Sequence, residues 1–180
     1  MKVTPTALPG VLLIEPQVFE DARGVFFESF NAKTFAAHGI AAPFVQDNHS
    51  ISARNVVRGL HYQVRQPQGK LVRVIAGEIF DVAVDLRRQS PTFGRWTGAV
   101  MSAENRLQMW IPEGFAHGFS VLSNEAEVLY KTTDFYAADS ERAILWNDPA
   151  LAIDWQLTGP ARLSEKDQRA VPFATAEYFD

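Results

Sequence analysis

The chain has 180 residues, no cysteine and a formal net charge of -4, and 47% of its residues are hydrophobic. These values are typical of a single globular domain and exclude an intrinsically disordered chain. The absence of cysteine excludes disulfides, thiolate catalysis and cysteine-ligated zinc, and the negative charge argues against nucleic-acid binding.

No segment approaches the length of a membrane span, and the apolar run at residues 11–14 is too short for a signal peptide. We therefore expect a cytoplasmic protein that binds neither membranes nor nucleic acids.

Short runs of aromatic and β-branched residues, separated by glycine and proline, predict an all-β sandwich or barrel. In chain order, strands are expected at residues 11–19, 25–30, 44–52, 80–86, 95–101, 108–111, 115–121 and 127–136. Two further strands are expected on either side of a turn within residues 54–76. Asn31 and Ser164 are suited to cap two short helices, the first at residues 32–37. The turn-rich residues from about 140 to 180 are expected to form a helical C-terminal flap on this single domain.

Ionisable residues are concentrated in residues 54–70, where His61, several arginines and Lys70 precede the apolar run 71–75. Desolvating such groups costs several kcal/mol unless they are paired or titrate. This segment is therefore the first place to look for chemistry.

His61 is a candidate general base because an imidazole titrates near neutral pH, although a single strand histidine is more often a packing residue. Asp167 could orient that base, but the spacing from Ser164 to Asp167 is equally that of a capping box, which the sequence favours. Tyr130 could act as an acid if cations lower its pKa, or it could simply pack in a strand.

Lys70 and Arg58 could stabilise developing negative charge or be solvated charges at the strand ends, and Arg23 is placed in a surface turn. Strict alternation puts Gln46, Asn48 and Ser50 on one strand face. These three either line a wet cavity or lie on an exposed edge, and the exposed edge is the simpler interpretation.

The cupin signature would indicate a metal site, because it supplies two histidines from Gly-x5-His-x-His and another from Pro-x-Gly-x-x-His. Pro112, Gly114 and His117 match the second half, but Gln63 stands where the first half needs its second histidine. Glutamine is a poor ligand for zinc or iron, so we expect the scaffold without a metal.

A series of motifs in order along nearly the whole chain closely resembles the dTDP-4-dehydrorhamnose 3,5-epimerase family, whose members have the cupin fold. The motifs are Phe19-x-Asp21-x-Arg23-Gly24-x-Phe26-x-Glu28, Gln46-Asp47-Asn48-x-Ser50, Arg58-Gly59-Leu60-His61-Tyr62-Gln63, Pro67-Gln68-Gly69-Lys70-Leu71-Val72-Arg73, Trp110 to Phe119, Tyr130-Lys131, Trp146-Asn147-Asp148-Pro149 and Leu163-Ser164-x-Lys166-Asp167.

The resemblance implies a jelly-roll homodimer, needing neither metal nor cofactor, that inverts two ring carbons flanking the ketone of a dTDP-linked 4-keto-6-deoxy sugar. It implies that His61 removes the proton with Asp167 as its partner, that Tyr130 returns a proton on the opposite face, and that Lys70 stabilises the enolate. The implied substrate-binding residues are Arg23, Glu28, Gln46, Asp47, Asn48, Arg58, His117, Glu141 and Lys166. Strands within about residues 1–30 would be exchanged across the dimer, so that Arg23 and Glu28 reach the partner's site.

Three alternatives remain beside the 3,5-epimerase. The nearest is a mono-epimerase or ketoisomerase acting on another nucleotide-linked 4-keto sugar, disfavoured because His61, Asp167 and Tyr130 are all present. A metal-dependent cupin oxygenase is disfavoured by Gln63, and a non-catalytic sugar-binding cupin would have no need of an acid and a base.

The segment at residues 54–70 also leads to a prediction about strand geometry. Strict strand alternation sets Arg58 and His61 on opposite faces, so both can reach one ligand only if the strand is bulged or begins near Gly59.

Overall fold

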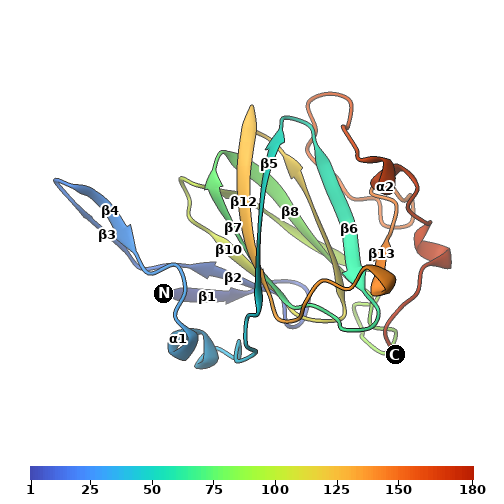
Figure 1. The fold of residues 1–180 in the computed structure, drawn as a ribbon, viewed down its shortest axis with the longest axis horizontal. Helices are drawn as coiled ribbons and strands as arrows, with labels where there is room; N and C mark the ends of the chain where they lie inside the picture. Colours follow the sequence, from blue (N-terminus) through green and yellow to red (C-terminus); the bar gives the residue numbers. More distant parts are fainter.

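Two antiparallel β-sheets face each other in the computed structural model, which describes residues 1–180 (Figure 1). In spatial order, the six-stranded sheet contains β1 (Lys2–Pro5), β2 (Leu12–Glu15), β10 (Gln108–Ile111), β7 (Lys70–Ala76), β12 (Glu125–Thr132) and β5 (Gln46–Ala53). The five-stranded sheet contains β13 (Glu141–Ala143), β6 (Val57–Gln63), β11 (Phe115–Val121), β8 (Glu78–Asp85) and β9 (Trp96–Ser102). The predicted all-β fold is confirmed.

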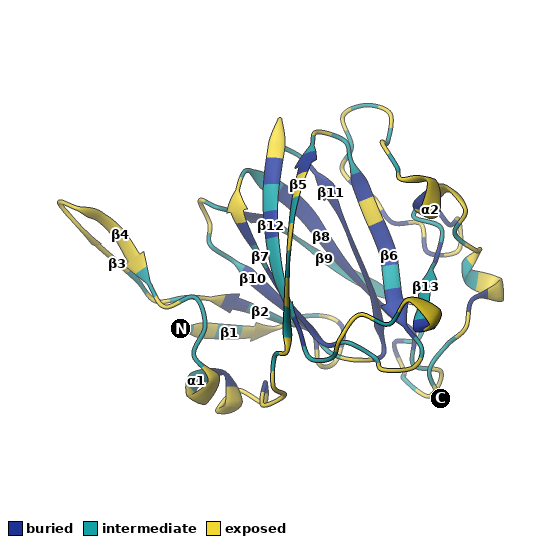
Figure 2. Cartoon of the chain, in the orientation of Figure 1, coloured by how far each residue is buried: buried dark blue, intermediate teal, exposed yellow.

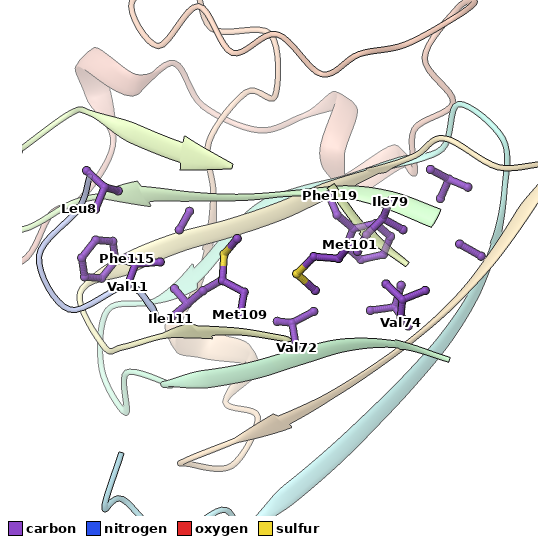
Figure 3. Close-up of a cluster of buried hydrophobic side chains, with 14 residues drawn as sticks. Leu8, Val11, Val72, Val74, Ile79, Met101, Met109, Ile111, Phe115 and Phe119 are labelled. Atoms are coloured by element: carbon purple, nitrogen blue, oxygen red, sulfur yellow. The ribbon is translucent and has the colours of Figure 1, made fainter. Parts of the chain in front are cut away.

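The main apolar core fills the space between the two sheets (Figure 3). Its side chains alternate along the strands, as Val72 and Val74 do on β7 and Phe115 and Phe119 do on β11. Burying these faces is the main favourable term for the fold, worth roughly 1.5–3 kcal/mol for each large apolar side chain.

The outer face of the five-stranded sheet is also buried, because the C-terminal residues cover it (Figure 2). Ile144, Leu151 and Trp155 pack there against outward-facing side chains such as Val82 and Val84 of β8. The segment predicted as a helical flap is therefore a packed layer of the domain. Its regular structure beyond β13 is limited to α2 (Glu165–Gln168) and the 3-10 turn η2 (Phe173–Thr175), after η1 (Ala138–Ser140).

Both predicted helix caps are present. The side chain of Asn31 accepts hydrogen bonds from the amides of Lys33 and Thr34 at the start of α1 (Ala32–Ala36), and Ser164 accepts one from the amide of Asp167. None of the helices has the length and hydropathy needed to cross a membrane.

The strands β1 and β13 were not predicted, and two of the expected strands differ most from the structure. The run 11–19 is divided at Pro16, which has no N–H for a ladder, so β2 ends there and a separate hairpin begins. The run 127–136 ends at Thr132 because the backbone turns away, and the amide of Tyr136 donates instead to the side chain of Gln46 at 3.0 Å.

The hairpin of β3 (Val18–Asp21) and β4 (Gly24–Phe27) projects from the body of the domain and pairs with neither sheet (Figures 1 and 2). Its turn uses Gly24 with a φ of 119°, a conformation that glycine adopts readily. Phe19 and Phe26 on the hairpin are 60% and 71% exposed, which is unusual for phenylalanine.

Candidate active site

A cavity of about 400 Å³ lies between the two sheets beside the apolar core. That volume is in the range of pockets that bind small molecules. The lining residues are Gln46, Asn48, Ser50, Arg58, His61, Tyr62, Gln63, Gln68, Lys70, His117, Gly118, Phe119, Tyr130, Tyr136, Glu141 and Lys166.

The polar face of β5 is one wall of this cavity. Gln46, Asn48 and Ser50 all line it, so the exposed-edge interpretation of these three side chains is wrong. The strand does lie at the edge of its sheet, but its side chains point between the sheets. The side chain of Asp47 faces the other way and pairs with Lys131, whose Nζ is 2.9 Å from Asp47 Oδ1.

The predicted bulge in β6 is confirmed. His117 of β11 is opposite His61 and Phe119 is opposite Arg58, so β6 has one more residue between these pairs than β11 does. The extra residue is accommodated at Gly59, whose φ is 116°. Arg58 and His61 thereby both line the cavity.

Asp167 makes both of the contacts considered from the sequence, one with His61 and one with Ser164 in the capping box of α2. Its Oδ1 is 2.5 Å from Nε2 of His61, while its Oδ2 accepts a hydrogen bond from the Ser164 hydroxyl at 2.7 Å. Its amide N–H donates to the same hydroxyl, which caps α2. The one-turn helix therefore fixes the carboxylate that orients His61.

His61 is arranged as a base. A hydrogen bond from Nε2–H to Asp167 leaves Nδ1 unprotonated in the neutral ring, and Nδ1 has no partner in the protein. Burial lowers the pKa of His61 below its usual value of 6.5, although the hydrogen bond and charge of Asp167 oppose this. Burial alone would raise the pKa of Asp167, but its hydrogen bonds with His61 and Ser164 outweigh burial and lower it. At neutral pH the pair is a neutral imidazole beside a carboxylate.

Tyr130 comes from β12 of the six-stranded sheet, whereas His61 comes from β6 of the five-stranded sheet. The two residues therefore belong to opposite walls of the cavity. Burial raises the pKa of Tyr130 above 10, with Arg58 opposing the shift and Glu141 adding to it. The condition considered for an acid role, a pKa lowered by cations, is not met, because burial outweighs Arg58 and the phenol keeps its proton at neutral pH.

Lys70 is a buried amine in the same cavity, and its Nζ donates to the backbone carbonyl of His61 at 3.3 Å. Burial lowers its pKa to about 8, while the charges of Asp81 and Glu141 favour the protonated form. The ammonium is thus held in a dry position where its charge acts strongly on a neighbouring oxygen.

Further polar groups surround the mouth of the cavity. Glu141 bonds to Lys166 and accepts a hydrogen bond from the Tyr136 hydroxyl at 2.8 Å. Arg58 donates from Nε to the Ser52 hydroxyl at 2.9 Å, which fixes the start of its guanidinium. Arg58 and Lys166 are the cations suited to a diphosphate.

Gln63 lines the cavity, but its side chain is taken up by the backbone. Nε2 donates to the carbonyls of Gln66 at 2.7 Å and Phe135 at 3.2 Å, and Oε1 accepts from the amide of Ala137 at 2.9 Å. Metal-binding cupins have a metal ligand at this position, whereas Gln63 here holds the backbone at residues 66, 135 and 137. No group of three or more histidine, aspartate and glutamate side chains is arranged to hold a metal ion.

Three of the predicted substrate-binding side chains lie outside the cavity of their own chain. Asp47 is on the outer face of β5, Arg23 is bound to Asp21 in the hairpin turn, and Glu28 accepts a hydrogen bond from Asn31 at 3.0 Å. The other predicted side chains all line the cavity except Asp167, which contacts it through His61.

Several residues of the site were missed, among them Tyr136 and Gln68, which line the cavity, and Asp81, which bonds to His117 of the cavity wall. Tyr136 was expected at the end of a strand over 127–136. For Asp81 the signal was two aspartates, Asp81 and Asp85, among the apolar residues of one expected strand.

The sequence matches the family model described as dTDP-4-dehydrorhamnose 3,5-epimerase over residues 5–175. The chain belongs to this family. The dTDP-4-dehydrorhamnose 3,5-epimerase of Pseudomonas aeruginosa is 63% identical to it over 180 residues, which cover 99% of each chain.

Solved structures of related epimerases have the same cupin fold. The epimerase of Legionella pneumophila, in complex with dTDP-4-keto-L-rhamnose, has a TM-score of 0.95 and 51% identity, covering 98% of this chain and 94% of that one. A 3'-monoepimerase from Streptomyces bikiniensis, in complex with dTDP-quinovose, has a TM-score of 0.89 and 32% identity, covering 95% and 87%. The predicted jelly-roll epimerase fold is thus confirmed.

Proposed function

We propose that this chain converts dTDP-4-dehydro-6-deoxy-D-glucose to dTDP-4-dehydro-L-rhamnose, inverting C-3 and C-5 in dTDP-L-rhamnose biosynthesis. The observation that carries the proposal is a histidine base and a tyrosine acid on opposite walls of one cavity, with a buried lysine beside them. Family membership and the high identity to 3,5-epimerases support the same reaction.

Each inversion needs a proton removed from one face of the sugar ring and another returned to the opposite face. In our proposal Nδ1 of His61 takes the proton from a carbon next to the ketone, and the electron pair moves onto the keto oxygen. Tyr130 then gives its proton to the other face of the same carbon. Before the second carbon reacts, His61 gives its proton to solvent and Tyr130 takes one from solvent. The steps need no redox cofactor because no electrons are gained or lost.

The carbon acid is far weaker than imidazolium, and each pKa unit of that difference costs about 1.4 kcal/mol. The enolate must therefore be stabilised as it forms. Lys70 is suited to this task because its ammonium is buried, so water does not screen its charge. Asp167 acts through His61, as the partner of its Nε2–H.

We assign the binding of the nucleotide diphosphate and sugar to Arg58, Lys166, Gln46, Asn48, Glu141 and His117. All six line the same cavity, and Arg58 and Lys166 supply positive charge for the diphosphate.

We further propose a homodimer in which the hairpin of β3 and β4 extends to a second copy. The exposed Phe19 and Phe26 and the lack of pairing to either sheet support a partner for this hairpin, since an isolated two-stranded hairpin is marginal in water. Arg23 and Glu28 would then act in the partner's site, and the substrate-binding role expected for Asp47 stays a prediction. The cytoplasmic location expected from the sequence stays a prediction.

Proton exchange with solvent tests the reaction directly. Incubation with dTDP-4-dehydro-6-deoxy-D-glucose in deuterated water, followed by NMR, should show deuterium at both C-3 and C-5. Deuterium at one carbon only would make the enzyme a mono-epimerase, like the Streptomyces relative. No incorporation would refute epimerase activity on this substrate.

Two variants separate the base from the acid. His61→Ala should abolish exchange at both carbons, because His61 is the proposed base for both proton removals. Tyr130→Phe should reduce the epimerised product by about 10²–10⁴-fold while impairing exchange less, since removal of the proton does not use the phenol. Equal loss of exchange and product in Tyr130→Phe would contradict its role as the acid.

A further inference from the structure

Glutamine side chains hold the backbone of the loop that brings Tyr136 to the cavity. This loop, residues 134–137, lies between the end of β12 and the start of η1. The three glutamines come from separate parts of the chain, since Gln46 begins β5, Gln63 ends β6 and Gln68 precedes β7. Four consecutive residues are thereby tied to other strands through side chains alone.

Gln63 makes most of these contacts. Its Nε2 donates to the carbonyls of Gln66 at 2.7 Å and Phe135 at 3.2 Å, and its Oε1 accepts from the amide of Ala137 at 2.9 Å. Gln63 is only 3% exposed, so its hydrogen bonds are made away from water. The partners fix the orientation of the side-chain amide, because two carbonyls need donors and one N–H needs an acceptor.

Gln46 and Gln68 hold the rest of the loop. Oε1 of Gln46 accepts from the amide of Tyr136 at 3.0 Å, and Nε2 of Gln68 donates to the carbonyl of Asp134 at 2.8 Å. The amides of Tyr136 and Ala137 have no backbone acceptor. The glutamine side chains therefore supply the hydrogen bonds that a neighbouring strand would otherwise supply.

The position of this loop decides where a row of polar groups lies. Tyr136 is 57% exposed and lines the cavity, and its hydroxyl donates to Glu141 at 2.8 Å. Glu141 also bonds to Lys166, one of the two cations that we assign to the diphosphate. A loop that moved would take Tyr136 away from Glu141 and leave Lys166 less firmly placed.

We propose that Gln63 is a positioning residue for the binding of the sugar nucleotide. It holds the loop so that Tyr136 and Glu141 keep Lys166 in place. The proposed base, acid and enolate-stabilising lysine lie on β6, β12 and β7, outside the loop. Loss of the Gln63 hydrogen bonds should therefore weaken nucleotide binding more than it slows the chemical steps. The kinetic consequence rests on the proposed epimerase function, whereas loop protection and dTDP binding are measured without turnover.

The decisive variant is Gln63→Met, which has a similar length and volume but lacks these hydrogen bonds. The amide of Ala137 loses its acceptor, so its hydrogen exchange, followed by NMR, should become about tenfold faster or more. The Kd for dTDP and the KM for the sugar nucleotide should each rise by about fivefold or more, while kcat changes less than about threefold.

Ser120→Ala is the matched control, because it also removes a buried hydrogen bond from a side chain to the backbone. Ser120 of β11 is 0% exposed, and its hydroxyl donates to the carbonyl of Trp155 at 2.6 Å. Trp155 belongs to the C-terminal layer on the outer face of the sheet. This variant should lower the melting temperature and leave both the exchange of Ala137 and the affinity for dTDP unchanged.

Unchanged exchange of Ala137 in Gln63→Met would overturn the proposal, and so would faster exchange without a loss of dTDP affinity. Equal effects in Ser120→Ala would also overturn it, because they would reflect a general loss of stability. If Gln63→Met does not fold, the unaltered protein gives a second test. Its Tyr136 and Ala137 amides should exchange about tenfold or more slowly than in an unstructured peptide, and unprotected amides would refute the assignment.

The proposed function can fail separately from this inference. If the unaltered protein binds dTDP but shows no epimerase activity, a weaker dTDP affinity in Gln63→Met would still support the positioning role, and only the proposed reaction would be refuted.

Discussion

At the scale of single residues, burial sets the protonation states that the reaction needs. Burial lowers the pKa values of His61 and Lys70 and raises that of Tyr130. The proposed base is therefore neutral, the proposed acid keeps its proton, and Lys70, with a pKa of about 8, is an ammonium at neutral pH. Each state follows from the position of the side chain between two sheets.

These shifts predict a bell-shaped dependence of kcat/KM on pH. His61 must be neutral to accept a proton, so activity should fall as the pH drops through its lowered pKa, which is below 6.5. Lys70 must be charged to stabilise the enolate, so activity should also fall as the pH rises through about 8. Tyr130 does not limit this range because its pKa lies above 10. Initial rates between pH 5 and 10 check this, and an alkaline limb above pH 10 would exclude Lys70 as the titrating group.

At the scale of elements, one bulge in β6 decides the shape of the binding site. It lets Arg58 and His61 face the same cavity, although regular alternation would separate them. The bulge depends on close contact between two glycines, since a Cβ on Gly59 would be 2.6 Å from the Cα of Gly118. Any side chain at this position must push the two strands apart.

We predict that Gly59→Ala destabilises the protein by about 3 kcal/mol or more, because it combines a positive φ with a clash against backbone. Gly24→Ala is the matched control. Its φ of 119° is close to the 116° of Gly59, but no atom lies within 4 Å of its added Cβ, so it should cost only about 1–2 kcal/mol. Urea unfolding of both variants gives the comparison, and equal losses would show that backbone strain alone is responsible.

At the scale of the whole molecule, the projecting hairpin makes the proposed dimer a part of the site. Arg23 and Glu28 are held on an arm that leaves their own domain, and neither lines their own cavity. A shared site requires that the two residue sets come from different chains.

Mixing two inactive variants tests this. Arg23→Ala has an intact His61, and His61→Asn has an intact Arg23, so one of the two sites in a mixed dimer is complete. After unfolding and refolding an equal mixture, random pairing should restore about a quarter of the activity of the unaltered enzyme. Neither variant alone should recover. No recovery in mixtures that contain mixed dimers would place Arg23 in the site of its own chain.

Much of this protein was determined by local sequence. The alternation in residues 115–121 fixed the inward face of β11, Asn31 and Ser164 marked the helix starts, and Gly59 allowed the bulge. The ordered motifs also identified the family and most cavity residues, because the resemblance assigned roles that residue type alone left open for His61, Lys70 and Tyr130.

Other features depended on residues far apart in the chain. The polar face of β5 became a cavity wall only because the second sheet lies opposite it, and Tyr136 lines the same cavity because the chain turns at Thr132. Asp81 became a partner of His117 because β8 pairs with β11, which brings the two side chains from separate strands together on one face of the sheet. Sequence patterns record which side chains share a face, whereas burial and pKa values depend on what long-range packing brings against that face.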